Sequence, residues 1–434
     1  MGRYRADRLL TLDGSVSIVT DGVVDVDGGR ISWVGAAADA PYRPDAPVHR
    51  VHGVLMPGFV NTHCHTPMVL LRGAGEGLPV DRWLTEVIWP RESRLVAEDV
   101  TWGMRLGAAE LIRNGVTTSA EMFFHADRMA AAAAEVGLRS VVAAPVIESS
   151  HHFDFGSWQE QLDAMVDLAA GYADHDLIDV ALGPHAAYST SEACLRGVGE
   201  VAREHGLMVQ IHLAEQDGED ARIRERYGNS VPAFLADLGV LDADVLGAHG
   251  IWFDDDDIDI LVDHDVAIAH CPCSNAKHGS GVIRLGDLRA AGVKVGLGTD
   301  GPVSHNRLDI FEEMRTAIRL QRAHHADASL MTVADVLTMA TTGGAAVLRR
   351  DDIGRLAPGC RADMIAVSLD DPAFTPVVDD PDDLLTHLVW AATPASVTDA
   401  WIEGRHVLDA GRVTTIDLGE AVSEVARRAR RLAS

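Results

Sequence analysis

The sequence Pro57-Gly58-Phe59-Val60-Asn61-Thr62-His63-Cys64-His65 decides the fold, because it is a short apolar run that ends in two histidines. Residues two apart on a β-strand face the same side, so the side chains of His63 and His65 can reach one metal ion. Polar residues also end later apolar runs, at His212, His249 and Asp300. In a parallel barrel the carboxyl ends of all strands share one face, which is where active sites lie. The pattern therefore predicts one site assembled from several strand ends.

Eight such apolar runs are candidate strands, and helix-like segments separate several of them. The candidate strands are residues 58–63, 116–122, 140–147, 180–184, 208–212, 245–249, 266–271 and 293–299. Helical stretches include residues 126–136, 191–205 and 308–323. This alternation predicts an α/β protein with a closed (β/α)8 barrel over residues 58–357, although a doubly wound parallel sheet shares the same alternation. The acidic run Asp254 to Asp257 is typical of a solvated face or a helix start.

Both ends of the chain carry short β-type runs instead. Near the N-terminus these are residues 16–19, 23–26 and 31–34, with turns predicted at Asp13-Gly14, Asp21-Gly22 and Gly28-Gly29. Near the C-terminus they are residues 364–367, 397–402 and 406–408. Neither end has enough strands for a stable sheet of its own. We therefore expect residues 1–57 and 358–434 to pair into one small β domain.

Composition excludes several classes of partner. The 434 residues include 37 Lys+Arg against 65 Asp+Glu, which gives a formal net charge of −28. Nucleic acids and anionic membranes both need clustered basic residues, so neither is an expected partner. Five cysteines, an odd number in a long chain, indicate a reducing compartment rather than a disulfide framework. Without a visible signal peptide or membrane-spanning run, we expect a cytoplasmic protein, and a homo-oligomer stays open.

Histidine and carboxylate side chains at several strand ends indicate a metal site. Nitrogen and carboxylate ligands with one open position suit zinc, and iron and manganese are alternatives. A structural interpretation also exists, in which the histidines are buried and satisfied by hydrogen bonds within the protein.

The motifs at residues 57–65, His212-Leu213-Ala214-Glu215 and Gly298-Thr299-Asp300-Gly301 resemble the amidohydrolase superfamily. The branch they resemble contains cytosine, guanine and S-adenosylhomocysteine/5′-methylthioadenosine deaminases and triazine hydrolases, and the resemblance covers essentially the whole chain. It implies a distorted (β/α)8 TIM barrel beside a small β-sandwich formed by both termini.

The resemblance also implies the metal ligands, which are His63, His65, His212 and Asp300, around one divalent ion that is usually zinc or iron. Superfamily members with two ions generally bridge them with a carboxylated lysine from a middle strand. The only lysines here are Lys277 and Lys294, after the seventh predicted strand and on the eighth, which favours one ion.

A catalytic scheme follows from these residues. By resemblance, His249 lies beside the metal and hydrogen-bonds the attacking water. We expect Asp300 to take the proton of that water and pass it to the leaving amine, and Glu215 to protonate a ring nitrogen. Loss of ammonia then leaves a ring carbonyl. The structural alternatives are a solvated loop carboxylate for Glu215 and a satisfied buried histidine for His249.

The spacing after the first two histidines resembles that of adenosine-type deaminases. In those proteins the residues matching Trp83 and Glu92 pack near the substrate and hydrogen-bond the ribose hydroxyls, and His185 matches a histidine near the sugar or purine. A carboxylate that accepts from two adjacent hydroxyls suits ribose, because charge-assisted bonds are stronger than neutral ones. As structural alternatives, Trp83 packs in the core, Glu92 caps or pairs at a helix start, and His185 bonds the backbone.

The chain departs from the branch at the end of the third strand. Relatives that accept homocysteine carry an arginine there for the amino-acid carboxylate, and Ala144 stands at the matching place. The absence of this arginine counts against S-adenosylhomocysteine as a substrate, since arginine is the natural bidentate partner of a carboxylate. The following loop contains His151-His152, a surface pair or a contact to a different 5′ tail.

The expected function is metal-dependent hydrolytic deamination of the 6-amino group of an adenine nucleoside with a modified 5′ end. Candidate substrates are 5′-methylthioadenosine, 5′-deoxyadenosine, adenosine, aminodeoxyfutalosine and compounds of the S-adenosylhomocysteine type. One alternative is a deaminase or chlorohydrolase of a free base or triazine. Another, from a different class, is a metal-binding protein without catalytic activity.

Overall fold

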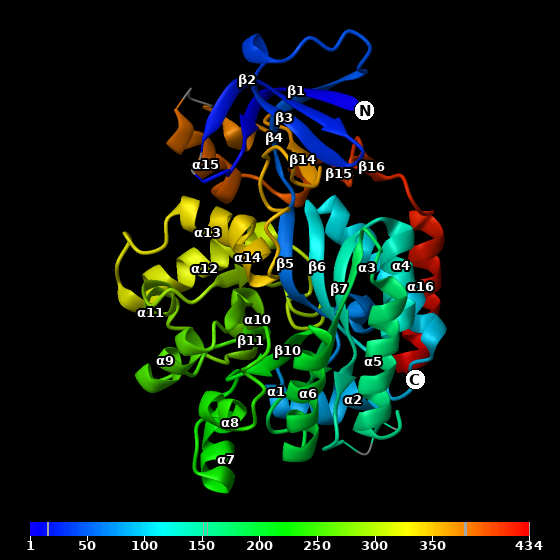
Figure 1. The fold of residues 1–434 in the computed structure, drawn as a ribbon, viewed down its shortest axis with the longest axis vertical. Coiled ribbons are helices and arrows are strands. Elements are labelled where there is room, and N and C mark those ends of the chain that lie inside the picture. The colour runs from blue at the N-terminus through cyan, green and yellow to red at the C-terminus, as the bar shows by residue number, and fades with distance from the viewer. Residues whose placement is uncertain (15–16, 151, 154, 377–379, 434) are drawn as a thin grey trace.

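Eight parallel strands form a barrel in the lower half of the molecule (Figure 1). The computed structural model describes residues 1–14, 17–150, 152–153, 155–376 and 380–433. Neighbouring barrel strands are β5 (Phe59–Cys64), β6 (Val116–Met122), β7 (Arg139–Ala143), β9 (Ile178–Pro184), β10 (Met208–Leu213), β11 (Val245–His249), β12 (Ala267–His270) and β13 (Val295–Leu297). β13 lies beside β5, where the backbone N–H of Asp300 donates to the carbonyl of His63 at 3.0 Å. The predicted barrel is therefore confirmed.

One predicted strand is broken in the structure. Residues 140–147 were expected to form a single strand, but β7 ends at Ala143 and the two-residue β8 (Pro145–Val146) pairs separately with β9. Pro145 has no N–H to donate to a continuing ladder, which explains the interruption after Ala144. The break lies at the carboxyl end of the barrel, next to the candidate site.

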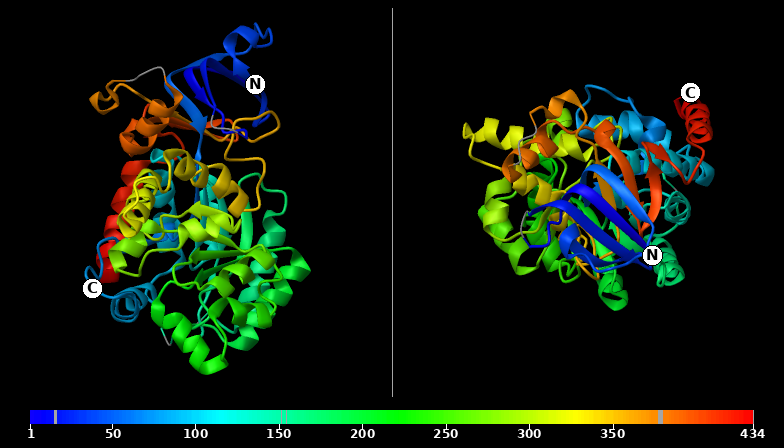
Figure 2. Two further views of the ribbon diagram at one scale, coloured as in Figure 1. Left: turned by 90° about the vertical axis from the view of Figure 1, so that its left-hand side faces the viewer. Right: turned by 90° about the horizontal axis from the view of Figure 1, so that it is seen from above.

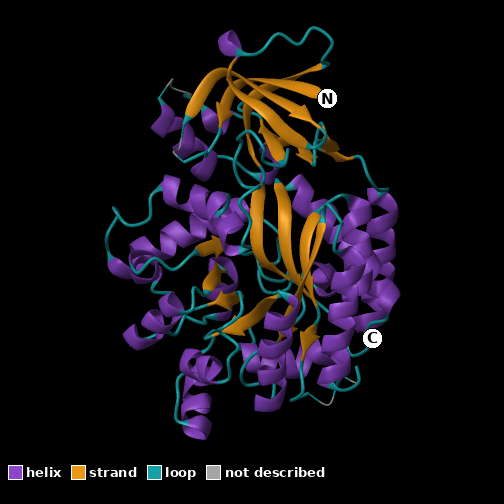
Figure 3. Cartoon of the chain, in the orientation of Figure 1, coloured by secondary structure: helices purple, strands orange, loops and turns teal. Residues whose placement is uncertain are grey.

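Helices surround the barrel strands (Figure 3). In chain order the α-helices of the barrel region are α1 (Val80–Trp83), α2 (Trp89–Glu92), α3 (Ala97–Arg113), α4 (Ala126–Val136), α5 (Trp158–Tyr172), α6 (Glu192–His205), α7 (Asp217–Tyr227), α8 (Val231–Asp237), α9 (Asp255–Asp263), α10 (Pro272–His278), α11 (Leu285–Ala290), α12 (Ile310–His325), α13 (Val333–Met339) and α14 (Thr342–Val347). Two helical segments of other types flank α1, the 3₁₀-helix η2 (Thr66–Leu71) and the π-helix η3 (Leu84–Ile88).

Side-chain caps fix several helix starts close to the predicted positions. The side chain of Ser191 accepts from the backbone N–H of Cys194 at the start of α6. Asp254 accepts from the N–H of Asp257 at the start of α9, so the acidic run begins a helix. Asp309 caps α12, which starts and ends two residues later than residues 308–323.

The two ends of the chain build one sheet at the top of the barrel (Figures 1 and 2). β4 (Val48–Pro57) joins the two halves, since it pairs parallel with β1 (Gly2–Leu10) and antiparallel with β14 (Met364–Val367). The predicted pairing of the termini is therefore confirmed. In spatial order the strands are β17 (Arg412–Val413), β16 (Arg405–Asp409), β15 (Val397–Ile402), β14 (Met364–Val367), β4 (Val48–Pro57), β1 (Gly2–Leu10), β2 (Ile18–Asp27) and β3 (Arg30–Ala36).

The turn predicted at Asp21-Gly22 is wrong, because β2 continues through both residues. A Cβ on Gly22 would lie 2.5 Å from the Cβ of Leu9, so this glycine permits close packing of β1 on β2 instead of a turn. The turn at Gly28-Gly29 is confirmed, with φ of +59° and +80° between β2 and β3. Of the run at residues 16–19, Val16 lies outside the described residues.

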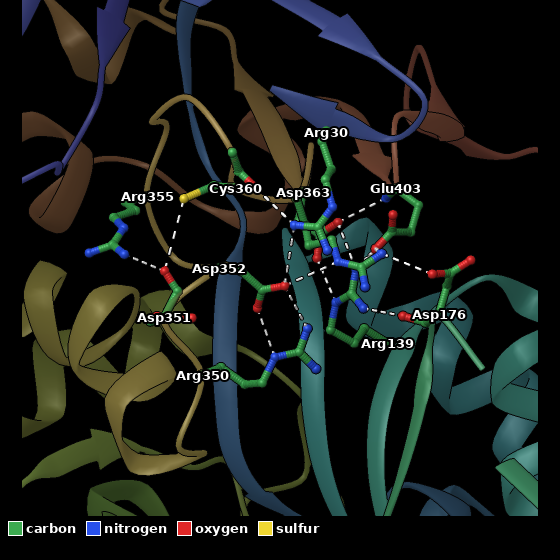
Figure 4. A network of polar contacts seen from close by, with 12 residues as sticks. Arg30, Arg139, Asp176, Arg350, Asp351, Asp352, Arg355, Cys360, Asp363 and Glu403 are labelled. Atoms are coloured by element: carbon green, nitrogen blue, oxygen red, sulfur yellow. Dashed lines mark hydrogen bonds and ion pairs between the residues drawn. The ribbon is translucent and has the colours of Figure 1, made fainter. Parts of the chain in front are cut away.

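Buried ion pairs join the barrel to the sheet (Figure 4). Arg139, at the start of β7, has a side chain only 1% exposed, and its Nε donates to the carboxylate of Asp363 at 2.8 Å. The same guanidinium also contacts Glu403. Arg361 contacts Glu403 at 2.7 Å and Asp176 at 3.0 Å. The network therefore lies at the amino ends of the barrel strands, opposite the candidate site.

The C-terminal helix α16 (Leu418–Ala433) packs on α3 at the side of the barrel (Figure 1). Arg428 on α16 pairs with the buried Asp99 of α3 at 2.9 Å. The remaining short elements lie in the chain between strands of this sheet. One, η1 (Ala37–Asp39), lies between β3 and β4, and three lie between β14 and β15, namely η4 (Pro372–Phe374), α15 (Pro381–Trp390) and η5 (Pro394–Ser396). All five cysteines are free thiols. Among the helices that the structure describes, none is long and apolar enough to cross a bilayer.

Candidate active site

Four predicted metal ligands converge at the carboxyl end of the barrel. His63 lies one residue before the end of β5 and His65 directly follows the strand, His212 lies on β10, and Asp300 follows β13. Nitrogen atoms of His63, His65 and His212 lie within 4.8 Å of one another, as do ligand atoms of His63, His249 and Asp300. The parallel strands bring together residues as far apart in the sequence as His63 and Asp300.

The ring nitrogens of these histidines are arranged as they would be around a cation. The Nδ1 atoms of His65 and His212 lie 2.5 Å from the carbonyl of Met122 and 2.8 Å from that of His185, so each Nδ1 donates a proton. In the neutral form that a metal ligand takes, each ring then presents an unprotonated Nε2, and these two atoms face each other at 3.2 Å. The buried Nε2 of His63 has no hydrogen-bond partner among the described residues. Three unsatisfied acceptors that point at one place fit a divalent metal.

The spacing of the donor atoms fits one ion. Zn–N and Zn–O bonds of about 2.0–2.2 Å place two ligand atoms about 3.3 Å apart in a tetrahedral site. The Oδ1 atom of Asp300 lies 3.3 Å from Nε2 of His65 and 3.8 Å from Nε2 of His63. Burial lowers the pKa of both His63 and His212 well below the usual value, which keeps them neutral as metal ligation requires.

Hydrogen bonds hold the carboxylate of Asp300 in position. Its Oδ2 accepts from the hydroxyls of Ser274 at 2.6 Å and Ser304 at 2.8 Å, and its Oδ1 accepts from the N–H of Gly301 at 2.7 Å. Burial alone would raise the pKa of Asp300, but the adjacent imidazole of His65 and the surrounding histidines lower it well below the usual range. Asp300 is therefore an ionised, oriented acceptor.

His249 and Glu215 stand beside this cluster. The imidazole of His249 stacks on that of His212 with ring centres 5.7 Å apart, and its Nδ1 lies 2.9 Å from Oδ1 of Asn275. The amide oxygen orients the ring and leaves Nε2 free to face the cavity. Glu215 is only 9% exposed, and burial raises the pKa of its carboxyl. Its backbone N–H donates to the buried Glu219 at 3.1 Å.

One cavity contains the predicted substrate-binding residues together with metal donors. Its lining includes Trp83, Glu92 and His185, as well as His65, His212, Glu215, His249 and Asp300. Trp83 donates through Nε1 to the carbonyl of Ala74 at 3.2 Å and packs against His278. His185 contacts the hydroxyl of Ser189 at 2.9 Å, and burial lowers its pKa to about 3, so it is neutral.

Glu92 has an unusual environment for a carboxylate. It is 7% exposed, and burial raises its pKa to about 7. Burial and the charge of His65 are the influences on this pKa, no hydrogen bond to the carboxylate from a described residue is among them, and Glu92 lines the cavity. A buried carboxylate without a donor is costly unless a ligand supplies one.

The side of the cavity near Ala144 is apolar and aromatic. Phe123, Phe124, Pro145 and Ile147 line it, together with Trp89. The ring of Phe124 lies 4.7 Å from that of Phe153 and 5.1 Å from that of Phe155. His151 lies outside the described residues, and His152 is not among the described residues that line the cavity.

Sequence reasoning missed the residues that orient the predicted ligands. Ser274, Ser304 and Asn275 have no role in the sequence-based prediction, although they hold Asp300 and His249. Their positions in the sequence could have identified them, since Ser274 and Asn275 follow β12 and Ser304 follows β13. Hydroxyl and amide groups just after barrel strands belong to the face that carries the site.

Comparisons with known proteins agree with this geometry. A family model described as the amidohydrolase family matches residues 54–407. A 5-methylthioadenosine/S-adenosylhomocysteine deaminase of Pelotomaculum thermopropionicum is 38% identical and covers 98% of this chain and 97% of its own. A 5′-deoxyadenosine deaminase of Methanothermobacter thermautotrophicus is 36% identical over 91% of each chain. A zinc-bound adenosine deaminase structure from Xanthomonas campestris superposes with a TM-score of 0.93 at 33% identity, covering 99% of this chain and 98% of that one. The chain belongs to the amidohydrolase family.

Proposed function

We propose that this protein is a metal-dependent hydrolytic deaminase, which replaces the 6-amino group of an adenine nucleoside with oxygen and releases ammonia. The observation that carries the proposal is the buried carboxylate of Glu92, which has no described donor and lines the same cavity as His65, His212 and Asp300. The adjacent hydroxyls of a ribose would supply two donors to it. The names of the similar deaminases support the same reaction.

The ligands we propose for the metal are His63, His65, His212 and Asp300, and the ion we propose is zinc. When bound, the metal supplies the Lewis acidity that makes water nucleophilic near neutral pH. A single ion is supported by the position of the two lysines. Lys277 donates to the carbonyl of Val303 at 2.8 Å, and Lys294 pairs with Asp265 on the outside of the barrel.

The protein side chains then move the protons. Asp300, ionised and held by two serines, accepts a proton from the attacking water and later gives it to the leaving amine. Glu215, whose pKa burial raises, holds the proton that a ring nitrogen needs before attack at the neighbouring carbon. His249 orients the water and is itself oriented by Asn275.

The nucleoside would lie between Trp83, Glu92 and His185. Glu92 would accept from the ribose hydroxyls, Trp83 would pack against the sugar or the 5′ group, and neutral His185 would contact the sugar or purine. The apolar wall at Phe124 and Ile147 supports an uncharged 5′ substituent.

The 5′ group we favour is hydrogen or methylthio rather than homocysteine. None of the described residues that line the cavity is an arginine or a lysine, and Ala144 stands where a carboxylate-binding arginine is expected. A buried homocysteine carboxylate would therefore lack a cationic partner, which costs binding energy. We expect 5′-methylthioadenosine, 5′-deoxyadenosine and adenosine to be better substrates than S-adenosylhomocysteine or aminodeoxyfutalosine.

The test is ammonia release by metal-loaded protein on matched pairs of substrates. Adenine, adenosine, 2′,3′-dideoxyadenosine and 5′-methylthioadenosine would be compared in the wild type, in Glu92→Gln and in the exposed control Glu98→Gln. We expect Glu92→Gln to lower kcat/KM for ribonucleosides about 10- to 100-fold, as loss of a charged acceptor does, with little effect on the dideoxynucleoside.

Two outcomes would overturn the proposal. Activity confined to free bases or triazines, unchanged in Glu92→Gln, would favour the deaminase or chlorohydrolase of bare rings. Folded, metal-loaded protein that releases ammonia from no substrate in an extended panel with guanine, cytosine and an aminotriazine would favour a binding protein.

A further inference from the structure

Three potential metal ligands outside the cavity form a second cluster. Cys273 lies in the first turn of α10, His305 in the loop after β13, and Glu313 in the first turn of α12. The thiol sulfur, one imidazole nitrogen and one carboxylate oxygen lie within 4.8 Å of one another. None of the three lines the cavity that contains Glu92 and Asp300.

We propose that Cys273, His305 and Glu313 bind a second, thiophilic divalent metal ion such as zinc, separate from the catalytic centre. Sulfur, imidazole nitrogen and carboxylate oxygen are the three donor types that zinc accepts in proteins, and a water molecule would complete a tetrahedron. Magnesium and calcium prefer all-oxygen sites, so the thiol selects against them.

The cluster is fixed by the protein before any ion arrives. The second carboxylate oxygen of Glu313 accepts from the backbone N–H of Cys273 at 3.0 Å, and the side chain of Glu313 is fully buried. The hydroxyl of Thr316 lies 3.2 Å from the sulfur of Cys273. Cys273 itself is partly exposed, so the cluster lies close to the protein surface.

His305 and Glu313 can both bind one metal ion if their side chains move slightly apart. Nδ1 of His305 lies 2.7 Å from Oε1 of Glu313 without the geometry of a hydrogen bond, and neither atom has a hydrogen-bond partner among the described residues. Two such ligands on one zinc ion stand about 3.3 Å apart, so the pair must widen by a few tenths of an ångström. Metal binding requires the thiol of Cys273 and Nδ1 of His305 to be deprotonated, and the protons that they lose pass to solvent. Asp309 and Glu312 add negative charge beside His305, which favours a cation.

The position of this cluster couples it to the catalytic carboxylate. Cys273 directly precedes Ser274, and His305 directly follows Ser304. These two serines donate the hydrogen bonds to Oδ2 of Asp300, at 2.6 Å and 2.8 Å. An ion that spreads His305 from Glu313 shifts Ser304 and loosens its bond to Asp300. We expect occupancy to lower kcat about tenfold, the usual order for a disturbed ligand-orienting contact, and to leave KM nearly unchanged.

A cobalt titration of the full-length protein tests the site. Protein that already holds one Co²⁺ per chain is titrated with more Co²⁺, and bound metal and thiolate-to-cobalt charge-transfer absorption are followed. The catalytic ligands contain no thiolate, so this absorption reports only a cysteine site. The variants are Cys273→Ser and His305→Asn, and the control is Cys360→Ser, a buried thiol in the loop that leads into β14.

We expect a second equivalent with the charge-transfer band in the wild type and in Cys360→Ser. Cys273→Ser should lose the band, both variants should lose the second equivalent, and both should keep the first together with their deaminase activity. A wild type that stops at one equivalent, or a band that persists in Cys273→Ser, would overturn the site. Turnover that stays constant when the second equivalent binds would overturn the coupling to Asp300.

A measurement on the wild type keeps the test independent of folding of the variants. Alkylation of the five cysteines by iodoacetamide, followed by mass spectrometry, should slow at Cys273 in the presence of excess zinc. Equal alkylation of Cys273 with and without excess zinc would contradict the proposal.

Discussion

The Nε2 atoms of His65 and His212 face each other at 3.2 Å, and each is an acceptor because the opposite nitrogen of its ring donates to a backbone carbonyl. Two lone pairs at this distance repel each other, and a metal ion that binds both nitrogens replaces the repulsion with two favourable bonds. The metal-free cluster is therefore strained, and metal binding should stabilise the fold.

Metal removal is predicted to lower the melting temperature. A ligand at a thousandfold excess over its Kd adds about 4 kcal/mol to the free energy of unfolding. Calorimetry should show a lower Tm after dialysis against a chelator and recovery when zinc returns. His212→Ala should abolish this metal-dependent rise, while His325→Ala, on the surface at the end of α12, should keep it. The same rise in His212→Ala would contradict the ligand assignment.

Ser274→Ala and Ser304→Ala are each predicted to lower kcat about 10- to 100-fold with little change in KM. Each hydroxyl orients the carboxylate of Asp300, which we assign to proton transfer, and neither serine lines the substrate cavity. Steady-state kinetics on an adenine nucleoside would measure the effects on kcat and on KM separately, with Ser423→Ala, at an exposed position, as the control. A rise in KM at constant kcat would indicate that the serines shape the pocket instead.

Much of the barrel could be predicted because its strands are buried along their length and therefore appear as apolar runs. Residues 116–122 and 245–249 match β6 and β11 at both ends. The convergence of His63, His65, His212 and Asp300 follows from topology alone, since parallel strands end on one face.

The rest of the fold depends on contacts that the local sequence does not show. β1 and β4 were not predicted, because charged residues interrupt β1 and the first half of β4 is largely exposed and polar, although both are central strands of the sheet. Gly22 looked like a turn because its partner, Leu9, is identified only by the sheet. The hydrogen bond between Asn275 and His249 likewise joins two strand ends whose register the sequence leaves open. The domain limits at residues 57 and 357 and the cytoplasmic location stay predictions.

Glu219 is predicted to make stability depend on pH. It is fully buried on α7, and burial raises its pKa to about 8. An acid whose pKa is higher in the folded state than in the unfolded state binds its proton more tightly when folded. Its contribution to stability is therefore present below about pH 4.5 and is lost as pH rises towards 8, at about 1.4 kcal/mol per pH unit.

Glu219→Gln should remove this dependence while it keeps an oxygen that can accept from the N–H of Glu215. Urea unfolding at several pH values would show that the variant gains stability over the wild type as pH rises from 5 to 8. Glu225→Gln, exposed on the same helix, is the matched control and should follow the wild type. A constant difference between Glu219→Gln and the wild type would contradict the assignment.

Arg139→Met is predicted to destabilise the protein by about 3–5 kcal/mol, because it leaves the carboxylate of Asp363 buried without its cation. Arg105→Met, which removes a partly exposed pair with Glu135, should cost less than about 1 kcal/mol. The double variant Arg139→Met/Asp363→Leu should recover much of the loss, since the unpaired charge is then gone. Because the network lies at the amino ends of the barrel strands, protein that remains folded should keep its kcat. A fall in kcat in folded Arg139→Met would mean that the contact between barrel and sheet also shapes the catalytic face.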